Sequence, residues 1–480
     1  MAYTILHLSD LHRSDIDPIG NDELLSTLLA DRDRFVGEDP PIGDPDAIIV
    51  SGDLVQGVPL GTPDFALAVA EQYLVANEFL ERLAHEFLAG DRSKLIVVPG
   101  NHDVCWNTAL AAMEPIDADH LPRGFSPASC GPTADLRWRW DGLQAYRIAD
   151  RAVYEQRLSG FFDLVQAFYA DSPEVVHAEH FRMHSMLEGR IGIVAFNSCV
   201  GNDCFAFHGA ILEEAVAQAH MKVRPLGHEL LVAVWHHSIS GEPSATDYMS
   251  VSTVQRMIGR GFRLGFHGHQ HRAAAALQYI HLPEEERMAV ISAGSLCAGP
   301  RELPTGINRQ YNVVEIADDL SSARVHVREM SIATNFAPAR RNEFGGGSFI
   351  DITWQLPSGA ANANLERSNR LTLEAEAAFS AGDLAGALSL LSQLPPPRSP
   401  YARRLQLDAM QQLEAWNDIV DEFSDPATIA ELSAVAVALA RLGRPDEGHQ
   451  LLDVRGPELD LPEPAKRDLQ TALKTIGANQ

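Results

Sequence analysis

Residues 95–103, Leu-Ile-Val-Val-Pro-Gly-Asn-His-Asp, decide the fold of this chain. The first four are apolar and mostly β-branched, which predicts a short buried strand that Pro-Gly ends sharply. Glycine permits a tight turn at that point. An amide, an imidazole and a carboxylate therefore follow at the carboxyl end of the strand. Such groups are costly to bury without partners and are suited to a metal ion next to a proton donor.

Four more predicted strands, residues 4–8, 47–50, 230–234 and 262–266, each run into polar residues of the same kinds. Alternation along an extended chain places the two polar residues of a D-x-H or H-x-H triplet on one side. Together with the amide of the first turn, these strand ends supply two carboxylates and four imidazoles. The seven candidate metal ligands are Asp10, His12, Asp53, Asn101, His236, His269 and His271.

This set of ligands favours Mn²⁺, Fe or Zn²⁺ over Ca²⁺, because imidazole is a poor ligand for calcium. Seven ligands are too many for one ion and fit two ions that share a carboxylate. Predicted helices at residues 22–36 and 64–88 alternate with the strands, which indicates an α/β layered domain with its functional residues on loops at one sheet edge.

Residues 104–190 lack this alternation and contain many aromatic residues, which predicts a mainly helical insertion, or cap, over the mouth of the site. Five arginines fall between residues 137 and 157: Arg137, Arg139, Arg147, Arg151 and Arg157. They form either a solvated helix face paired with nearby acids, which we favour, or a cationic aromatic wall for a phosphorylated substrate.

The chain changes character after residue 330. Residues 331–358 are predicted to be a linker, with a closing strand at 349–354, and residues 359–480 an all-helical domain. The turns within about 365–455 resemble degenerate tetratricopeptide-type helical hairpins. A scaffold for a protein partner and a plain bundle packed on the first domain are both consistent with this pattern.

Composition limits the classes of function. The 480 residues predict more than one domain, and 38 basic against 65 acidic residues give a net charge of −27. That charge argues against a broad nucleic-acid or anionic membrane surface, so nucleic acid is expected only as a substrate. We expect a cytoplasmic protein, because the five cysteines form no CxxC pair and no secretory signal is evident. We expect no membrane segment, because no uninterrupted apolar stretch is long enough to span a membrane.

The ordered motifs D-x-H, G-D, G-N-H-D, H and G-H-x-H resemble the calcineurin-like metallophosphoesterase superfamily over about residues 3–330. The resemblance implies a four-layer α/β/β/α sandwich in a domain spanning residues 1–330. It implies one metal held by Asp10, His12 and His271. It implies that Asn101, His236 and His269 hold a second metal. The carboxylate of Asp53 would bridge the two metals.

In the same resemblance, His102 stands beside the substrate phosphate as a proton donor and Asp103 orients it. His236 is favoured over the adjacent His237 as the ligand. The implied function is a phosphoesterase with two divalent cations, Mn²⁺ being favoured, that uses metal-activated hydroxide. Phosphodiesters such as cyclic nucleotides or nucleic acid are the favoured substrates. The alternatives are phosphomonoester or phosphoprotein hydrolysis, or, in another class, a helical-repeat scaffold with a vestigial enzyme domain.

Overall fold

The structure is a computed structural model. It describes residues 2–14, 19–123, 125, 127, 130–239, 247–279, 287–299, 302–304, 307–330, 335–339, 347–354, 371–372, 374–376, 378–379, 382–394, 398, 400–459 and 461–478. The chain divides into two compact units, Met1–Leu356 and Pro357–Gln480. Within the described ranges, no helix is both long and apolar enough to cross a membrane.

Two seven-stranded sheets form the centre of the first unit. The first has the order β16 (Phe336–Pro338), β15 (Ser322–Met330), β14 (Gln310–Ile316), β1 (Tyr3–Leu8), β2 (Ala47–Val50) and β3 (Leu95–Val97), with β17 (Phe349–Thr353) also paired to β15. The second has the order β12 (Ala274–Tyr279), β13 (Arg287–Ser292), β11 (Phe262–His267), β10 (Leu230–Val234), β9 (Ile191–Phe196), β8 (Phe181–Met186) and β7 (Val176–His177). Strands β1 to β3 are mutually parallel, and so are β9, β10, β11 and β13.

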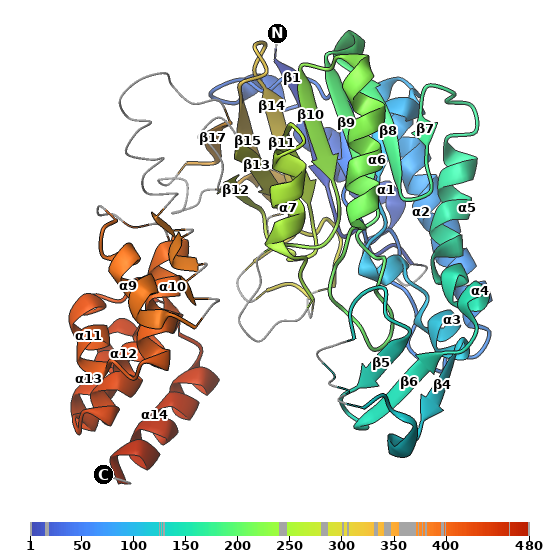
Figure 1. Ribbon diagram of the computed structural model, residues 1–480. Coiled ribbons are helices and arrows are strands. Elements are labelled where there is room, and N and C mark those ends of the chain that lie inside the picture. Colours follow the sequence, from blue (N-terminus) through green and yellow to red (C-terminus); the bar gives the residue numbers. More distant parts are fainter. Residues whose placement is uncertain are drawn as a thin grey trace. The chain divides into compact units, whose positions relative to one another are not determined.

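Side-chain alternation along the strands builds the layers. In β1, Leu6 and Leu8 pack against α1 (Asn21–Arg32) and α2 (Phe65–Leu88), whereas Ile5 lies in the core between the two sheets. In β9, the residues that face away from that core pack against α6 (Glu213–Val223) and α7 (Val251–Ile258), which Figure 1 shows on the near side of the strands. The predicted four-layer α/β/β/α sandwich is therefore confirmed.

The segment between residues 104 and 190 differs from the prediction. Strands β4 (Met113–Ile116), β6 (Gln144–Ile148) and β5 (Leu136–Arg139) form a small antiparallel sheet, and β7 and β8 extend the second large sheet. Helices α3 (Trp106–Ala111), α4 (Arg151–Glu155) and α5 (Ser159–Phe168) complete the segment. The prediction that it lacks strands is wrong, because the buried residue at the centre of β5 is Arg137 and the hydrophobic alternation is hidden.

The second unit is helical, as predicted, and all its described regular structure is helix. The helices are α9 (Leu384–Leu391), α10 (Pro400–Gln412), α11 (Trp416–Glu422), α12 (Ile429–Arg441), α13 (Pro445–Arg455) and α14 (Glu463–Ala478). Successive helices pack on one another around small apolar cores. The tetratricopeptide-type repeat stays a prediction. Much of the predicted linker (residues 331–334, 340–346 and 355–358) and the start of the predicted helical domain (residues 359–370) lie outside the described residues.

Candidate metal centre

The polar loops after β1, β2, β3, β10 and β11 meet at one edge of the sandwich because these strands are parallel within their sheets. Backbone hydrogen bonds hold the loops side by side. The amides of Asp10 and His12 donate to the carbonyls of Gly52 (3.1 Å) and Asp53 (2.9 Å). On the second sheet, the Gly268 amide donates to the carbonyl of His236 at 3.1 Å.

One group of candidate ligands comprises Asp10, His12, Asp53 and His271, whose ligand atoms all lie within 4.8 Å of one another. Nε2 of His271 lies 3.2 Å from Oδ1 of Asp10 and 3.3 Å from Nε2 of His12. The first three residues are buried, and His271 is the most accessible of the group.

A second group comprises Asn101, His236 and His269. Oδ1 of Asn101 lies 2.9 Å from Nε2 of His236 and 2.9 Å from Nδ1 of His269, and these two ring nitrogens are 3.2 Å apart. Oδ2 of Asp53 lies 3.3 Å from His236 Nε2 and 4.0 Å from His12 Nε2, so this carboxylate stands between the two groups. All seven residues singled out in the sequence are thus brought together.

Hydrogen bonds to backbone carbonyls determine which ring nitrogens are available as ligands. Nδ1 of His236 lies 2.8 Å from the Ser51 carbonyl, and Nδ1 of His271 lies 2.8 Å from the Glu302 carbonyl. A carbonyl can only accept, so in each histidine Nδ1 carries the proton and Nε2 presents its lone pair to the centre. Metal-binding histidines commonly have this arrangement.

The donor set fits divalent cations. Ligand atoms about 2.1 Å from a common ion and at right angles lie about 3 Å apart, close to the separations between these nitrogens and oxygens. Burial raises the pKa of the Asp53 carboxyl, but positive charge on protonated His236 and His102 outweighs it and holds that pKa well below its usual range. When Nε2 of His236 serves as a ligand and that ring is neutral, a bound cation would supply the positive charge instead. The centre therefore contains a buried carboxylate that remains anionic and needs positive charge nearby.

The two residues predicted to act on the substrate have different placements. His102 is partly accessible, its ring lies edge-on to that of His12 with centroids 4.5 Å apart, and its Nδ1 lies 2.7 Å from the Gln56 carbonyl. Asp103 is buried, and its carboxylate accepts hydrogen bonds from the amides of Gly100 (2.8 Å) and Leu54 (3.2 Å).

The expectation that Asp103 orients the His102 ring is therefore corrected. Among the described contacts, its carboxylate bonds the two amides and the hydroxyl of Tyr73 (3.2 Å), so it shapes the turn, and Gln56 orients the imidazole. Burial, followed by the charge of Asp53, raises the pKa of Asp103 to about 7. Backbone amides at a turn are common hydrogen-bond partners for an aspartate. Nothing in the local sequence shows whether Asp103 bonds such amides or orients the ring of His102.

His237, the alternative to His236, lies outside the ligand cluster. Its Nδ1 is 2.9 Å from the hydroxyl of Ser198, and its Nε2 is 3.4 Å from the amide nitrogen of Asn202. Sequence reasoning missed Asp247, whose Oδ2 lies 3.2 Å from Nε2 of His269 and fixes that ring with Nδ1 inward. Asp247 follows no predicted strand, so no local signal could have revealed it.

Four of the five arginines between residues 137 and 157 have structural partners. Arg137 is buried, with Nε 2.5 Å from Oδ2 of Asp203. Arg157 donates to three backbone carbonyls and lies over the ring of Tyr154. Arg139 and Arg151 pair with Asp141 and Asp135. The expected acidic partners are present for Arg137, Arg139 and Arg151. Arg137 and Arg157 are buried, so they do not lie on a solvated face. Among the described residues, these contacts leave no continuous cationic wall.

The fold and the ligand cluster together define the class of metallophosphoesterases. The chain belongs to the calcineurin-like phosphoesterase family, whose family model matches residues 3–273, more than half of the sequence. This confirms the resemblance inferred from the motifs. No curated protein matches the chain.

Three of the solved structures that resemble this chain are distant from it in sequence. TT1561 of Thermus thermophilus is 11% identical, with 68% of this chain and 99% of that chain covered and a TM-score of 0.32. A calcineurin-like phosphoesterase, YfkN from Bacillus subtilis, is 11% identical over 77% and 96% of the two chains, with a TM-score of 0.31. Vps29 from Chaetomium thermophilum is 11% identical over 74% and 100%, with a TM-score of 0.26. At such scores the family assignment depends on the family model.

Proposed function

We propose that this protein is a phosphoesterase that uses two divalent cations, with phosphodiesters as its preferred substrates. The observation that carries the proposal is the position of Asp53, between a group formed by Asp10, His12 and His271 and a group formed by three further ligands. A carboxylate placed between two clusters of nitrogen and oxygen donors is suited to bridging two ions.

The donor set supports the choice of metal. Imidazole nitrogens mixed with carboxylate and amide oxygens favour Mn²⁺, with Fe or Zn²⁺ as alternatives. Bound in pairs, such cations supply Lewis acidity toward phosphate oxygens and a nucleophilic hydroxide at neutral pH. The residues that would hold them keep their lone pairs directed inward through the backbone hydrogen bonds of His236 and His271.

The role proposed for His102 follows from its contacts. Because its Nδ1 donates to the Gln56 carbonyl, its Nε2 is the atom left to hold or move a proton. A protonated Nε2 can donate to a phosphate oxygen as negative charge builds up, or to the departing alkoxide. His102 is also more accessible than the buried ligand His12, as a group that meets substrate must be.

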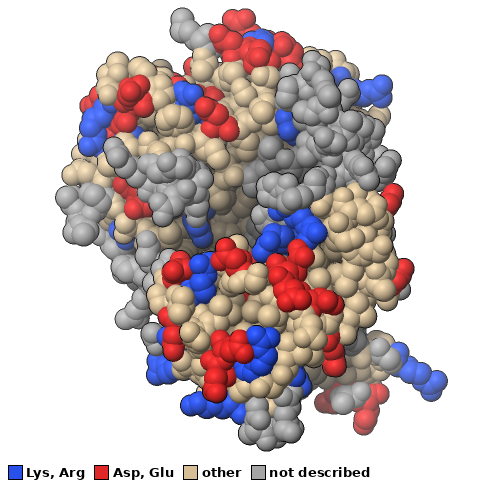
Figure 2. All heavy atoms as spheres, turned by 90° about the vertical axis from the view of Figure 1, so that its left-hand side faces the viewer, with Lys and Arg blue, Asp and Glu red and all other residues tan. Residues whose placement is uncertain are grey.

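Phosphodiesters are the favoured substrates, with cyclic nucleotides or nucleic-acid ends as candidates. Hydrolysis of phosphomonoesters or phosphoproteins is the alternative. The net charge of −27 favours small substrates over long nucleic acid. On the face drawn in Figure 2, acidic and basic side chains lie interspersed. A cytoplasmic location and a protein partner for the helical unit belong to the same proposal. Within the described part of the chain no disulfide joins any of the five cysteines, which supports the location.

The test is hydrolysis of bis-p-nitrophenyl phosphate and p-nitrophenyl phosphate in the presence of Mn²⁺, Fe²⁺ or Zn²⁺. Asp53→Asn should lose bound metal and activity together, whereas His102→Gln should retain metal and lose about 10²–10⁴-fold in kcat. His85→Gln, at an exposed histidine of α2, is the matched control. Absence of hydrolysis with every metal, with the biological effect intact in Asp53→Asn, would instead identify a scaffold with a vestigial site.

A further inference from the structure

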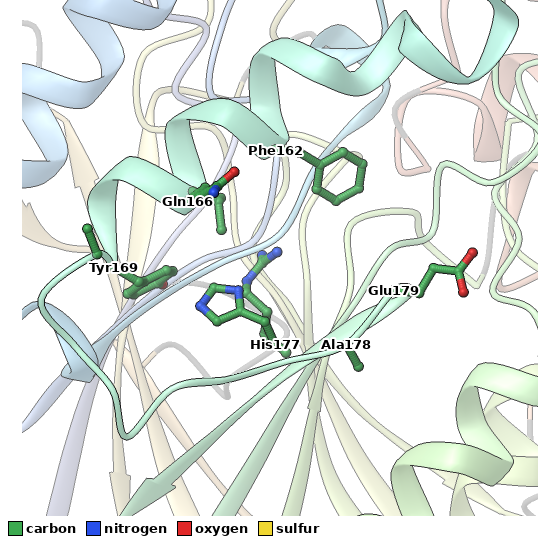
Figure 3. A pocket seen from close by; sticks show the side chains of 9 residues that line it. Phe162, Gln166, Tyr169, His177, Ala178 and Glu179 are labelled. Carbon is green, nitrogen blue, oxygen red and sulfur yellow. The ribbon is translucent and has the colours of Figure 1, made fainter. Parts of the chain in front are cut away.

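A cavity of about 590 Å³ lies between α5 and the chain around β7 and β8. Its lining residues are Phe162, Val165, Gln166, Tyr169, Ala170, His177, Ala178, Glu179 and Arg182. Figure 3 shows Phe162 and Gln166 on the helix, with His177 and Glu179 on the segment below. None of the lining residues belongs to the candidate metal centre.

Arg182 is the unusual member of this lining. Its side chain is buried, with 6% of the residue exposed, and it lies over the ring of Phe161 with its carbon Cζ 5.4 Å from the ring centroid. Its Nη2 donates to the carbonyl of Val97, but its Nε is buried and has no hydrogen-bond partner within the described protein.

No described carboxylate lies within ion-pair distance of Arg182, in contrast to the buried Arg137 and Arg328, which pair with Asp203 and Asp31. Burial lowers the pKa of the Arg182 guanidinium, and the only opposing effect comes from Tyr169. A buried cation without a counter-ion is strongly unfavourable, so a group of this kind calls for an explanation.

The other polar groups of the cavity do not supply the missing anion. The hydroxyl of Tyr169 donates to the carbonyl of Leu95, and the carboxylate of Glu179, at the exposed rim, lies 3.7 Å from Nε2 of His180. Burial, together with Arg182, lowers the pKa of His177, which keeps that ring neutral. Arg182 is thus the one cation among the described lining residues.

We propose that this cavity binds a small organic anion, a carboxylate or phosphate-type group with an apolar body, whose charged end pairs with Arg182. The volume falls in the range of small-molecule sites, which combine apolar walls with few polar groups. Phe162, Val165 and Tyr169 provide the apolar wall. A guanidinium that lines a cavity makes strong charge-assisted hydrogen bonds to carboxylate or phosphate oxygens.

The test is calorimetric titration of the full-length, metal-loaded protein with benzoate and with phenylphosphonate, which share a ring and differ in the anion. Phenylphosphonate has no ester bond, so phosphoesterase activity does not consume it. We expect benzoate to bind at one site per chain. Phenylphosphonate can also bind at the metal centre, so only the part of its binding that depends on the cavity residues is assigned to the cavity.

Arg182→Met should weaken binding about tenfold or more, the loss expected from one charge-assisted bond. Since Arg182 also bonds to Val97, a second variant avoids that contact. Gln166→Trp places a large ring into the cavity from an exposed helix position, and Asp163→Trp, exposed on the same helix but outside the cavity, is its control.

Gln166→Trp should abolish benzoate binding and remove the cavity part of phenylphosphonate binding, whereas Asp163→Trp should bind both probes like the wild type. If neither probe binds the wild type at millimolar concentration, the proposal is overturned. It is equally overturned if Gln166→Trp binds both probes unchanged, since the anion would then occupy another site such as the metal centre. Neither result depends on whether the protein hydrolyses phosphate esters.

Discussion

At the scale of single residues, the backbone of the metal centre adopts unusual conformations. Five of the seven candidate ligands have positive φ angles between 45° and 75°: Asp10, His12, Asp53, His269 and His271. For residues with a Cβ this region costs about 1–3 kcal/mol each, and it persists where the surroundings enforce it. The hydrogen bonds between the loops after β1 and β2 provide part of that enforcement.

This strain leads to a prediction for metal removal. A cation that binds only the folded state, at a free concentration about 100 times its dissociation constant, stabilises that state by about 2.7 kcal/mol. We therefore expect chelation to lower the Tm measured by calorimetry, and added Mn²⁺ to restore it. Asp53→Asn, which lacks the bridging carboxylate, should show no chelator-dependent shift. An identical Tm of the wild type with and without chelator would contradict a metal centre at this position.

A glycine supports the same carboxylate by leaving space for it. A Cβ at Gly100 would stand 2.1 Å from Oδ1 of Asp53, although the backbone there has φ −113°, which any residue can adopt. Gly100→Ala should thus displace Asp53 by steric contact alone and reduce kcat/KM about 10²-fold, together with metal content by elemental analysis. Gly20→Ala, where a Cβ meets nothing within 4 Å, is the control and should leave both unchanged. Full metal content in Gly100→Ala would refute this account.

At the scale of elements, β3 shows how an edge strand is completed without another strand. It is the last strand of the first sheet, and three side chains bond to carbonyls of the strand and of the turn just before it. The donors are His184 to Ser93 (2.9 Å), Tyr169 to Leu95 (2.5 Å) and Arg182 to Val97. Covering an edge satisfies its backbone groups and prevents pairing with other chains. The turn that carries Asn101 and His102 therefore starts from a fixed strand.

His184 in this edge predicts a dependence of stability on pH. Burial lowers its pKa to about 3 from 6.5, so between these values the unfolded state binds a proton that the folded state does not. The contribution of neutral His184 to the free energy of unfolding is therefore complete above pH 6.5. It falls by up to about 1.4 kcal/mol per pH unit as the pH decreases toward 3.

Urea unfolding of the wild type and of His184→Gln at pH 7 and pH 5 measures this contribution. We expect the loss of unfolding free energy between the two pH values to be smaller in His184→Gln, because an amide does not titrate. His85→Gln, at an exposed histidine, should behave like the wild type. Equal losses in all three proteins would show that His184 is not held neutral in the folded state.

At the scale of the whole molecule, sequence and structure agree where the signal is local. The strands that carry the ligands are parallel and buried, so they are continuous apolar runs, and each ligand follows its strand within a few residues. Contacts between distant segments leave no such trace. Arg182 meets Val97 across 85 residues, and Glu302 meets Gln56 across 246 residues. The cavity and the outer contacts of the metal centre could therefore not be predicted.

The division of the chain into two units gives the last prediction. All seven candidate ligands, His102 and the three large cores of the sandwich belong to Met1–Leu356. A unit with its own core can fold alone, so a chain ending at Leu356 should retain the metal content and the kcat/KM of the full-length protein on bis-p-nitrophenyl phosphate. The comparison needs matched circular dichroism to establish that the shorter chain is folded. If a folded chain ending at Leu356 loses hydrolysis, the helical unit takes part in catalysis; if it keeps hydrolysis but loses its biological effect, the helices serve a partner.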